Sequence, residues 1–193
     1  MGEGLRIIPA TKDRWEDFEK LFGPSGACYG CWCMHWRQSH AERAKATSKG
    51  SKALIKRRFV KSPPPGLLAF EDETCVGWVQ VTRRAEVPRF NSPRASSRPL
   101  EAEETDDRGV WAITCFFFLA SHRGKGLSHQ MVRAAVDFAR QHGAKRLEAC
   151  PMQRSATSNA MSLYVGSAPV FVKAGFTEVA RRIPNRPLMR LDL

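Results

Sequence analysis

The sequence predicts an α/β domain, in which strand and helix patterns alternate along one chain. A continuously apolar run over residues 110–119, interrupted only by Thr114, is typical of a strand buried on both faces. Residues 127–142 follow with apolar side chains at helical spacing, and residues 146–150 return to a strand pattern. A length of 193 residues and a hydrophobic fraction of 42% indicate a single domain over residues 1–193 with a sizeable core.

The elements expected before the apolar strand follow from similar patterns. They are a strand over 5–10, a helix over 12–22 capped by Thr11, a basic and partly helical stretch over 41–60, and two strands over 66–70 and 75–82. Residues 71–74 are short and polar, so the last two strands are expected to form a hairpin. Residues 83–108 are rich in Pro, Ser and Arg and show little periodicity, which indicates one long loop over the surface.

The C-terminal part predicts a short helix and a final pair of strands. The elements expected there are an irregular polar stretch over 153–162, a short helix over 168–174 between Ser167 and Gly175, and strands over 176–182 and 188–193. Gly143 follows the long helix, where glycine is favoured because it adopts a left-handed backbone.

A glycine-rich loop, S-H-R-G-K-G-L-S over residues 121–128, joins the apolar strand to the long helix. The first amides of a helix lack intrahelical partners and lie at the positive end of the helix dipole, so an anion is favoured there. Gly124 and Gly126 let ligand oxygens approach the backbone, and Arg123 and Lys125 add positive charge. The loop therefore predicts a phosphate site, although its spacing fits neither the P-loop nor the dinucleotide fingerprint.

This loop resembles the pyrophosphate loop of the GCN5-related N-acetyltransferases (the GNAT superfamily), Arg/Gln-x-x-Gly-x-Gly/Ala. Arg123 and Gly126 fit that pattern, whereas Ser128 stands where Gly or Ala is usual. The order of elements over 110–193 is also similar to that family, including Ala-Gly-Phe at residues 174–176. The resemblance implies a GNAT fold, with a mixed, twisted and splayed central β-sheet flanked by helices and with acetyl-CoA lying where the sheet opens.

The resemblance also implies which residues hold acetyl-CoA. The backbone of Phe116, Phe117 and Phe118 would pair with the pantetheine arm like an added strand, because a splayed strand leaves main-chain groups without partners. The diphosphate would lie on the loop residues, which are Arg123, Gly124, Lys125, Gly126, Leu127 and Ser128.

The general acid of this family is often a tyrosine four residues before the glycine that ends the last helix, and that position is Phe171 here. Phenylalanine cannot donate a proton, so either another group protonates the departing thiolate or the thiolate leaves unaided. Tyr164 is the candidate substitute although its spacing differs, and an ordinary packed tyrosine is the alternative.

An alkylamine acceptor is mostly protonated at neutral pH, so a base or a water chain to one is useful. The candidate is Glu148, which resembles a glutamate at the same point in ribosomal-protein alanine acetyltransferases. The alternative for Glu148 is a solvated carboxylate at a strand edge, and Asp106 and Asp107 are second choices.

Four potential soft-metal ligands gather in one short stretch: Cys28, Cys31, Cys33 and His35. Structural zinc sites usually take ligand pairs from two separated segments, and no second pair is obvious, so no metal is expected. The residues between them include Tyr29, Trp32, Met34 and Trp36. We favour an aromatic lid on the acceptor site, with a metal-dependent interaction knuckle as the alternative. Cys115, within the apolar strand, is expected to be inert.

Charge and hydropathy limit which partners and which cellular compartment are expected. Lys and Arg number 31 against 19 Asp and Glu, and this net charge of +12 favours polyanions without choosing among them. The basic residues are spread along the chain, so we do not expect a nucleic-acid partner. Neither a membrane span nor a signal peptide is apparent, which predicts a cytoplasmic protein with reduced cysteines and no membrane partner. A homodimer is left open.

These inferences predict an N-acetyltransferase that moves acetyl from acetyl-CoA to a primary amine. The amine would attack directly in a ternary complex, with the carbonyl polarised by a backbone amide of residues 116–118. The acceptor is either a small amine with an apolar or planar group, which suits the aromatic lid, or an amine of an acidic or ribosomal protein, which suits the basic surface. The competing hypothesis is a degenerate GNAT fold that binds CoA or RNA without turnover.

Overall fold

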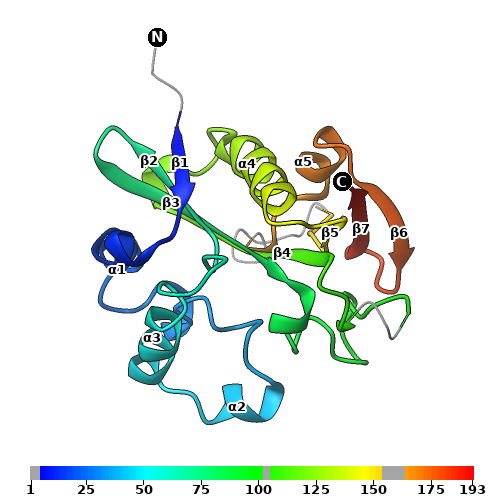
Figure 1. Ribbon diagram of the computed structural model, residues 1–193, viewed down its shortest axis with the longest axis horizontal. Coiled ribbons are helices and arrows are strands. Elements are labelled where there is room, and N and C mark those ends of the chain that lie inside the picture. The colour runs from blue at the N-terminus through cyan, green and yellow to red at the C-terminus, as the bar shows by residue number, and fades with distance from the viewer. Residues whose placement is uncertain (1–4, 102–104, 154–163) are drawn as a thin grey trace.

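Seven strands form one mixed β-sheet in the computed structural model, which describes residues 5–101, 105–153 and 164–193 (Figure 1). The strands are β1 (Arg6–Pro9), β2 (Leu67–Glu71), β3 (Thr74–Arg83), β4 (Val110–Phe118), β5 (Arg146–Ala149), β6 (Thr177–Arg181) and β7 (Pro187–Asp192). Their order across the sheet is β1-β2-β3-β4-β5-β7-β6. Neighbours run antiparallel except β4 and β5, which are parallel because a helix crosses between them.

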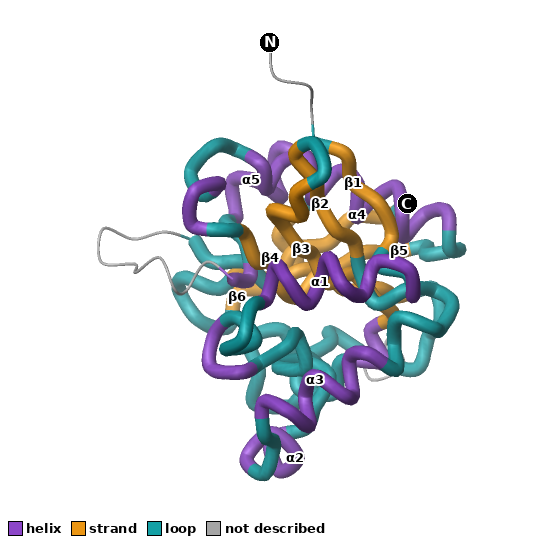
Figure 2. Tube along the Cα trace, turned by 90° about the vertical axis from the view of Figure 1, so that its left-hand side faces the viewer, coloured by secondary structure: helices purple, strands orange, loops and turns teal. Residues whose placement is uncertain are grey.

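Helices cover both faces of the sheet. They are α1 (Trp15–Phe22), α2 (His40–Ala44), α3 (Ser48–Lys56), α4 (Leu127–Gln141) and α5 (Ala168–Lys173), with 3-10 turns η1 (Lys12–Arg14), η2 (Cys28–Gly30), η3 (Arg84–Glu86) and η5 (Ala120–His122). α4 and α5 pack on one face and α1 on the other, and Figures 1 and 2 place α3 and then α2 progressively farther from the sheet than α1. Within the described ranges, every helix is too short or too polar to cross a lipid bilayer.

An aromatic cluster fills the α1 face of the sheet. Phe18 stacks on Phe22 with ring centroids 4.0 Å apart and meets Trp78 of β3 edge-on at 5.1 Å. Phe22 also stacks with Trp32, which lies beyond the end of α1. Because aromatic side chains bury large apolar areas, this cluster holds the irregular segment after α1 against the sheet.

The other face is covered by α4, whose apolar stripe has the spacing that the sequence predicted. Its buried side chains are Met131, Val132, Ala135, Val136, Phe138 and Ala139. The helix begins after Gly126, which is left-handed with φ of 76°, and the chain turns away at Gly143 with φ of 79°. Both ends of α4 are therefore set by glycines that the sequence shows directly.

Residues 83–101 are tied into the core, which makes the prediction of a long surface loop over 83–108 wrong for this part. Val87 and Phe90 are buried, and so is Arg84 in η3. Ser97 donates its hydroxyl to the carbonyl of Phe90 at 2.8 Å. Apolar residues at irregular spacing give no periodic signal, so their burial could not be predicted.

β4 is the strand at which the sheet opens. It pairs with β3 along its length, but with β5 only through its first four residues, up to Ile113. A register shift in the pairing with β3 skips Thr114, which is therefore bulged. Past Ile113, the edge of β4 that faces β5 has no strand partner in the described sheet. This opening confirms the predicted fold class, a mixed and splayed sheet flanked by helices.

Candidate active site

The glycine loop (residues 121–128) is exposed and is shaped by left-handed backbone. Gly124 and Gly126 have φ of 78° and 76°, and a Cβ at either would meet nothing within 4 Å. The two glycines are thus required by conformation and not by space. Across the described chain, no group is found to accept a hydrogen bond from the amides of Gly124, Lys125 or Gly126. These amides precede a helix of 15 residues, so they can bind an anion.

Two side chains of the glycine loop fix its position on the sheet. Arg123 donates from Nε to the carbonyl of Phe118 at 3.1 Å, which joins the loop to the end of β4. His122 bridges the loop to β2, with Nε2 at 2.9 Å from a carboxylate oxygen of Glu71 and Nδ1 at 2.9 Å from the hydroxyl of Ser121. The hydrogen bond to His122 lowers the pKa of Glu71. The loop is therefore anchored by side chains while its amides stay accessible.

The open edge of β4 leads from the glycine loop into the molecule. The amide of Leu119 donates to the carbonyl of Val76, on the β3 side, at 3.0 Å. Main-chain groups alternate in direction along a strand, so those of Phe116 and Phe118 face the open edge and those of Phe117 face β3. Of the three residues predicted to pair with pantetheine, Phe116 and Phe118 present backbone at the open edge, where the carbonyl of Phe118 already accepts a hydrogen bond from Arg123. Phe117 contributes its ring to a cavity instead.

A cavity of about 360 Å³ lies beside this edge. It is lined by Phe22, Ala27, Cys28, Tyr29, Cys31, Cys33, His35, Arg43, Cys115, Phe116, Phe117 and Tyr164. Most of these residues come from β4 and from the cysteine segment (residues 27–35). The cavity is of the size that small-molecule sites have, and aromatic rings and thiols make up much of its wall.

The cysteine segment faces the cavity in a way that differs from the expected aromatic lid. Trp32, Met34 and Trp36 are buried in the core, while Tyr29, 83% exposed, is the one predicted lid aromatic that lines the cavity. The four potential soft-metal ligands, Cys28, Cys31, Cys33 and His35, line the cavity instead. Within the described ranges, no group of three or more His, Cys, Asp or Glu is arranged to hold a metal ion. Trp32 and Cys33 both have a left-handed backbone, so the cysteine side chains face the cavity and the tryptophan side chains face the core, the reverse of what was expected.

His35 and Arg43 are the cavity residues that carry polar chemistry without having been predicted to do so. Burial, with help from Arg89 and Arg43, lowers the pKa of His35 to about 4, so the imidazole is neutral at pH 7. Arg43 is held by a hydrogen bond from Nη2 to the carbonyl of Tyr29 at 3.4 Å. No carboxylate is found among the described residues of the lining. The sequence indicated His35 only as a potential metal ligand, and nothing in it pointed to Arg43.

Tyr164, the predicted substitute acid, reaches the cavity. Its ring lies 5.7 Å from that of His35 and 6.5 Å from that of Trp36, and burial raises the pKa of its hydroxyl. Phe171, at the family's usual tyrosine position, is fully buried against Phe176 and Phe116. The structure thus brings Tyr164 to the cavity from outside the position that the family pattern indicates.

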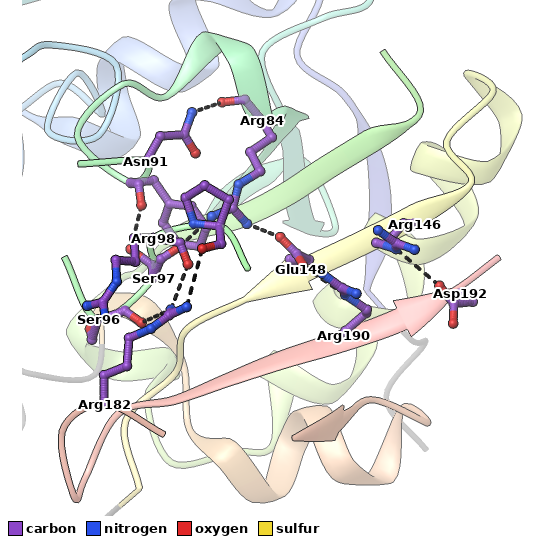
Figure 3. Close-up of polar contacts among 12 residues, drawn as sticks. Arg84, Asn91, Ser96, Ser97, Arg98, Arg146, Glu148, Arg182, Arg190 and Asp192 are labelled. Carbon is purple, nitrogen blue, oxygen red and sulfur yellow. Dashed lines mark hydrogen bonds and ion pairs between the residues drawn. The ribbon is translucent and has the colours of Figure 1, made fainter. Parts of the chain in front are cut away.

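Glu148 is neither a solvated strand-edge carboxylate nor part of the cavity lining (Figure 3). Its side chain is fully buried on β5, where Arg84 donates from Nη1 to one carboxylate oxygen. Arg190 of β7 donates from Nε and Nη2 to the other oxygen at 2.9 and 2.7 Å. A carboxylate held by two guanidinium groups is stabilised in its charged form and is poorly placed to take a proton from an amine. Its predicted role as a base stays a prediction.

The second-choice carboxylates lie at the wrong end of the strand for the cavity. Asp106 and Asp107 are exposed and precede β4, whereas the cavity borders its C-terminal half. Asp107 accepts a hydrogen bond from the amide of Gly109 at 2.7 Å, which supports the turn into β4.

The polar network around Glu148 continues into residues 83–101 and was not predicted. Arg84 also donates to the carbonyl of Ser97, and Arg182 donates from Nη1 to the carbonyls of Ser96 and Arg98 at 3.1 and 2.6 Å (Figure 3). The two Arg182 contacts join chain segments more than 80 residues apart. A lone arginine in a basic loop carries no signal for such a partner, so sequence reasoning could not find the network.

Comparisons with known proteins agree with this fold. The structure is similar to the GNAT domain of S. lividans PAT, with a TM-score of 0.56, 18% identity and coverage of 98% of this chain and 90% of that one. It is similar to yncA, a putative acetyltransferase from Salmonella typhimurium solved with acetyl-CoA, with a TM-score of 0.55, 16% identity and coverage of 99% and 95%. It is also similar to the PaiA N-acetyltransferase of Thermoplasma acidophilum, solved with coenzyme A, with a TM-score of 0.56, 12% identity and coverage of 99% of this chain and 100% of that one.

Such low identities show a shared fold and nothing finer. No curated protein matches the chain in sequence. The sequence profile of the Acetyltransferase (GNAT) family, however, matches residues 27–165, which is well over half of the 193 residues. The glycine loop, the open edge of β4 and the cavity all lie wholly or largely within the matched range. The chain therefore belongs to the GNAT family of acetyltransferases.

Proposed function

We propose that this protein transfers acetyl from acetyl-CoA to a primary amine of a small acceptor. The observation that carries the proposal is the open edge of β4, which joins an exposed anion site at one end to a partly open cavity at the other. Acetyl-CoA supplies an activated thioester, the chemistry that such a transfer needs.

The residues present fit this ligand. The unpartnered amides of Gly124, Lys125 and Gly126 can receive a diphosphate, and the Lys125 side chain adds a positive charge at an exposed position. At the open edge, the backbone of Phe116 and the amide of Phe118 can pair with an extended amide-containing arm. Acetyl-CoA lying along this edge would have its thioester near the cavity, where the amide of Phe116 can polarise the carbonyl.

Two side chains of the cavity, His35 and Tyr164, are proposed to handle the proton transfers of the reaction. The acceptor amine attacks the acetyl carbonyl directly in a ternary complex, and it must be neutral to do so. His35 is neutral at pH 7, and with a pKa of about 4 it is a weak base, so its role is to accept a hydrogen bond from the attacking amine or from a water that carries the proton to solvent. Tyr164, beside His35, keeps its proton at pH 7 and can donate it to the departing thiolate. Glu148 has no part in this scheme.

The lining favours one class of acceptor. Because the described lining has no carboxylate and includes the guanidinium of Arg43, it disfavours polyamines and other multiply charged cations. Aromatic side chains favour a monoamine with an apolar or planar body. A cavity of about 360 Å³ suits a small molecule better than a protein segment.

An acetyl-transfer assay by mass spectrometry over matched amines tests this function. We expect turnover with arylalkyl or aryl monoamines at least tenfold faster than with spermidine. Arg43→Ala should narrow that preference, whereas Arg57→Ala, an exposed arginine outside the cavity, should not change it. If spermidine proves the better acceptor, the assignment of the acceptor class is wrong.

The second candidate is a GNAT fold that binds CoA without turnover. It is favoured by Phe171 at the usual tyrosine position and by the sequestration of Glu148. Thermal-shift measurements with CoA, acetyl-CoA and RNA separate the candidates, because a ligand raises Tm according to its concentration over Kd. A CoA-dependent shift with no acetylated product over the amine panel would favour the binding module. A shift with RNA and none with CoA would exclude the enzyme.

A further inference from the structure

Three free thiols meet in the wall of the cavity. The sulfur of Cys33 lies 3.4 Å from that of Cys115, although the two residues are 82 positions apart in the sequence. Cys31 lines the same cavity. The pair links the cysteine segment to β4, the strand that carries the open edge. Acetyl transfer, as proposed above, makes no use of these thiols.

The backbone of the cysteine segment is held in a costly conformation that places the thiols there. Of the five non-glycine residues with positive φ in the described chain, four lie in this segment: Ala27, Tyr29, Trp32 and Cys33. Such residues persist only where their surroundings hold them. Here the indole of Trp32 donates to the hydroxyl of Ser48 at 2.8 Å, and the side-chain amide of Gln80 donates to the carbonyl of Cys33 at 3.0 Å.

The three thiols differ in reactivity. A hydrogen bond with Cys33 lowers the pKa of Cys31 to about 7, with further lowering by Arg43, so Cys31 has much thiolate character at neutral pH. Burial raises the pKa of Cys33 well above its ordinary value. A partly exposed thiolate therefore lies beside a buried pair of thiols, which is the arrangement of an attacking thiol and its resolving partners.

We propose that Cys31, Cys33 and Cys115 form an oxidant-responsive thiol site, at which hydrogen peroxide produces a disulfide between Cys33 and Cys115. The bond would tie the cysteine segment covalently to β4 in the wall of the cavity. The proposal depends on the placement of the thiols and not on acetyl transfer.

The chemistry proceeds in three steps. The thiolate of Cys31 attacks a peroxide oxygen, the O–O bond breaks, and Cys31 becomes a sulfenic acid as hydroxide leaves and is protonated to water. The sulfur of Cys33 then displaces the hydroxyl of Cys31, which leaves as water with the proton of Cys33, giving a bond between Cys31 and Cys33. Cys115 next attacks the sulfur of Cys33 and releases Cys31, which regains a proton. Overall, two thiols are oxidised by two electrons while peroxide is reduced to two waters.

The other cysteines supply controls. Cys75 on β3 is buried, its pKa is raised to about 12 by burial, and its sulfur lies 3.9 Å from the carbonyl of Gly77. Cys150 lies beside the hydroxyl of Ser96, at 3.4 Å. Neither contacts a second thiol among the described contacts.

Peptide mapping of the oxidised wild-type protein tests the site. The protein is treated with stoichiometric peroxide, its remaining thiols are trapped with N-ethylmaleimide, and it is digested with trypsin. The expected product joins peptide 21–37, which holds Cys33, to peptide 109–123, which holds Cys115, with loss of two thiols and reversal by dithiothreitol. Fragmentation within peptide 21–37 identifies the linked cysteine. Closing a loop of this length should also raise Tm by roughly 5–15 °C.

Two variants sharpen the result. Cys31→Ser should slow thiol loss at least tenfold, because the entry thiolate is gone, whereas Cys75→Ala should oxidise and crosslink as the wild type does. A linkage of Cys28 with Cys31, a sulfinic acid on Cys31 without a crosslink, or no thiol loss at all would each overturn the proposal. So would oxidation of Cys31→Ser at the wild-type rate. Peptide mapping uses the wild-type protein alone, so this test does not depend on whether any variant folds.

Discussion

The glycine loop and the cysteine segment border the same proposed active site, yet they are built on opposite plans. The glycine loop is exposed, follows a regular strand and opens a regular helix, and presents backbone amides. The cysteine segment has little regular structure, has four non-glycine residues in left-handed conformations, and presents side chains. One region would bind through groups that every residue has, and the other through groups specific to this sequence.

The difference indicates which region takes its conformation from residues that are near it in the sequence. The backbone conformation of the glycine loop requires only a glycine at positions 124 and 126 and the helix α4 that follows them. The cysteine segment depends on distant residues, since Trp32 packs on Phe22 and bonds to Ser48, and Cys33 is held by Gln80. We expect substitution of the buried anchor of the cysteine segment, Trp32, to act through stability, and substitutions in the glycine loop to act through ligand binding.

The largest expected effect follows from truncating the anchor of the cysteine segment. Trp32→Ala should lower the free energy of unfolding by roughly 3–5 kcal/mol, because the indole is 3% exposed and its loss leaves a cavity. Urea denaturation gives the value. Two controls, Tyr29→Ala in the same segment and Lys125→Ala in the glycine loop, should stay within about 0.5 kcal/mol, since both side chains are exposed. A cost below about 1 kcal/mol for Trp32→Ala would mean that packing does not hold the segment.

Glu148 tests whether the arginine network belongs to the architecture or to the chemistry. Glu148→Gln should destabilise the protein by about 2–3 kcal/mol, since it removes the charge that the buried Arg84 and the half-buried Arg190 share. We expect kcat of the folded variant to change less than threefold. Glu178→Gln, which breaks an exposed ion pair with Arg181, is the matched control and should cost less than about 0.5 kcal/mol.

The opposite result for Glu148 is equally informative. A fall in kcat of more than a hundredfold with stability retained would make Glu148 the base that the sequence predicted. The arginines would then be accessory to the chemistry, and His35 would lose its proposed role.

Sequence reasoning succeeded where the physical cause is local. The apolar run to β4, the helical period of α4 and the glycines at 126 and 143 each act through neighbours in the chain, so the fold class and the strand–loop–helix unit could be predicted. The splay of the sheet came with the family resemblance and not from any residue pattern. Because the glycine loop directly follows β4 in the sequence, the open edge of β4 necessarily lies beside that loop.

The cavity lining could not be predicted, because its causes are non-local. Simple alternation puts cysteines and aromatic residues on opposite sides but does not say which side faces the cavity, and the left-handed residues Trp32 and Cys33 break the alternation. The Glu148 network is equally hidden, since Arg84 and Arg190 lie 64 and 42 residues away. Sequence distance removes any signal that two such side chains will meet.

The desolvation of the cysteine segment should also appear as a pH dependence of stability. His35 has its pKa lowered from 6.5 to about 4 by burial, so between these values the unfolded chain binds a proton that the folded chain does not. Its contribution is therefore fully present above pH 6.5 and is lost as pH falls toward 4. We expect a loss of roughly 2 kcal/mol, allowing for the partial exposure of the ring.

The measurement compares unfolding free energies of the wild type and His35→Asn at pH 7 and pH 4.5. The variant should lose less stability across this interval than the wild type, by about that amount. Parallel slopes for the wild type and His35→Asn would show that His35 titrates as it does in the unfolded chain.

The smallest expected effect, on the glycine loop, separates ligand binding from folding most cleanly. Gly126→Ala places a Cβ on a residue with φ of 76°, which costs about 1 kcal/mol in stability and raises the Kd for CoA roughly tenfold as the loop shifts to relieve the strain. Gly143→Ala, at the other end of α4 with φ of 79° and open space around the new Cβ, should cost the same stability and leave CoA affinity unchanged. Calorimetric titration with CoA distinguishes the two variants. Equal CoA affinity in both would mean that the glycine loop is only a turn into α4, and the contrast between the two regions would then be one of shape and not of function.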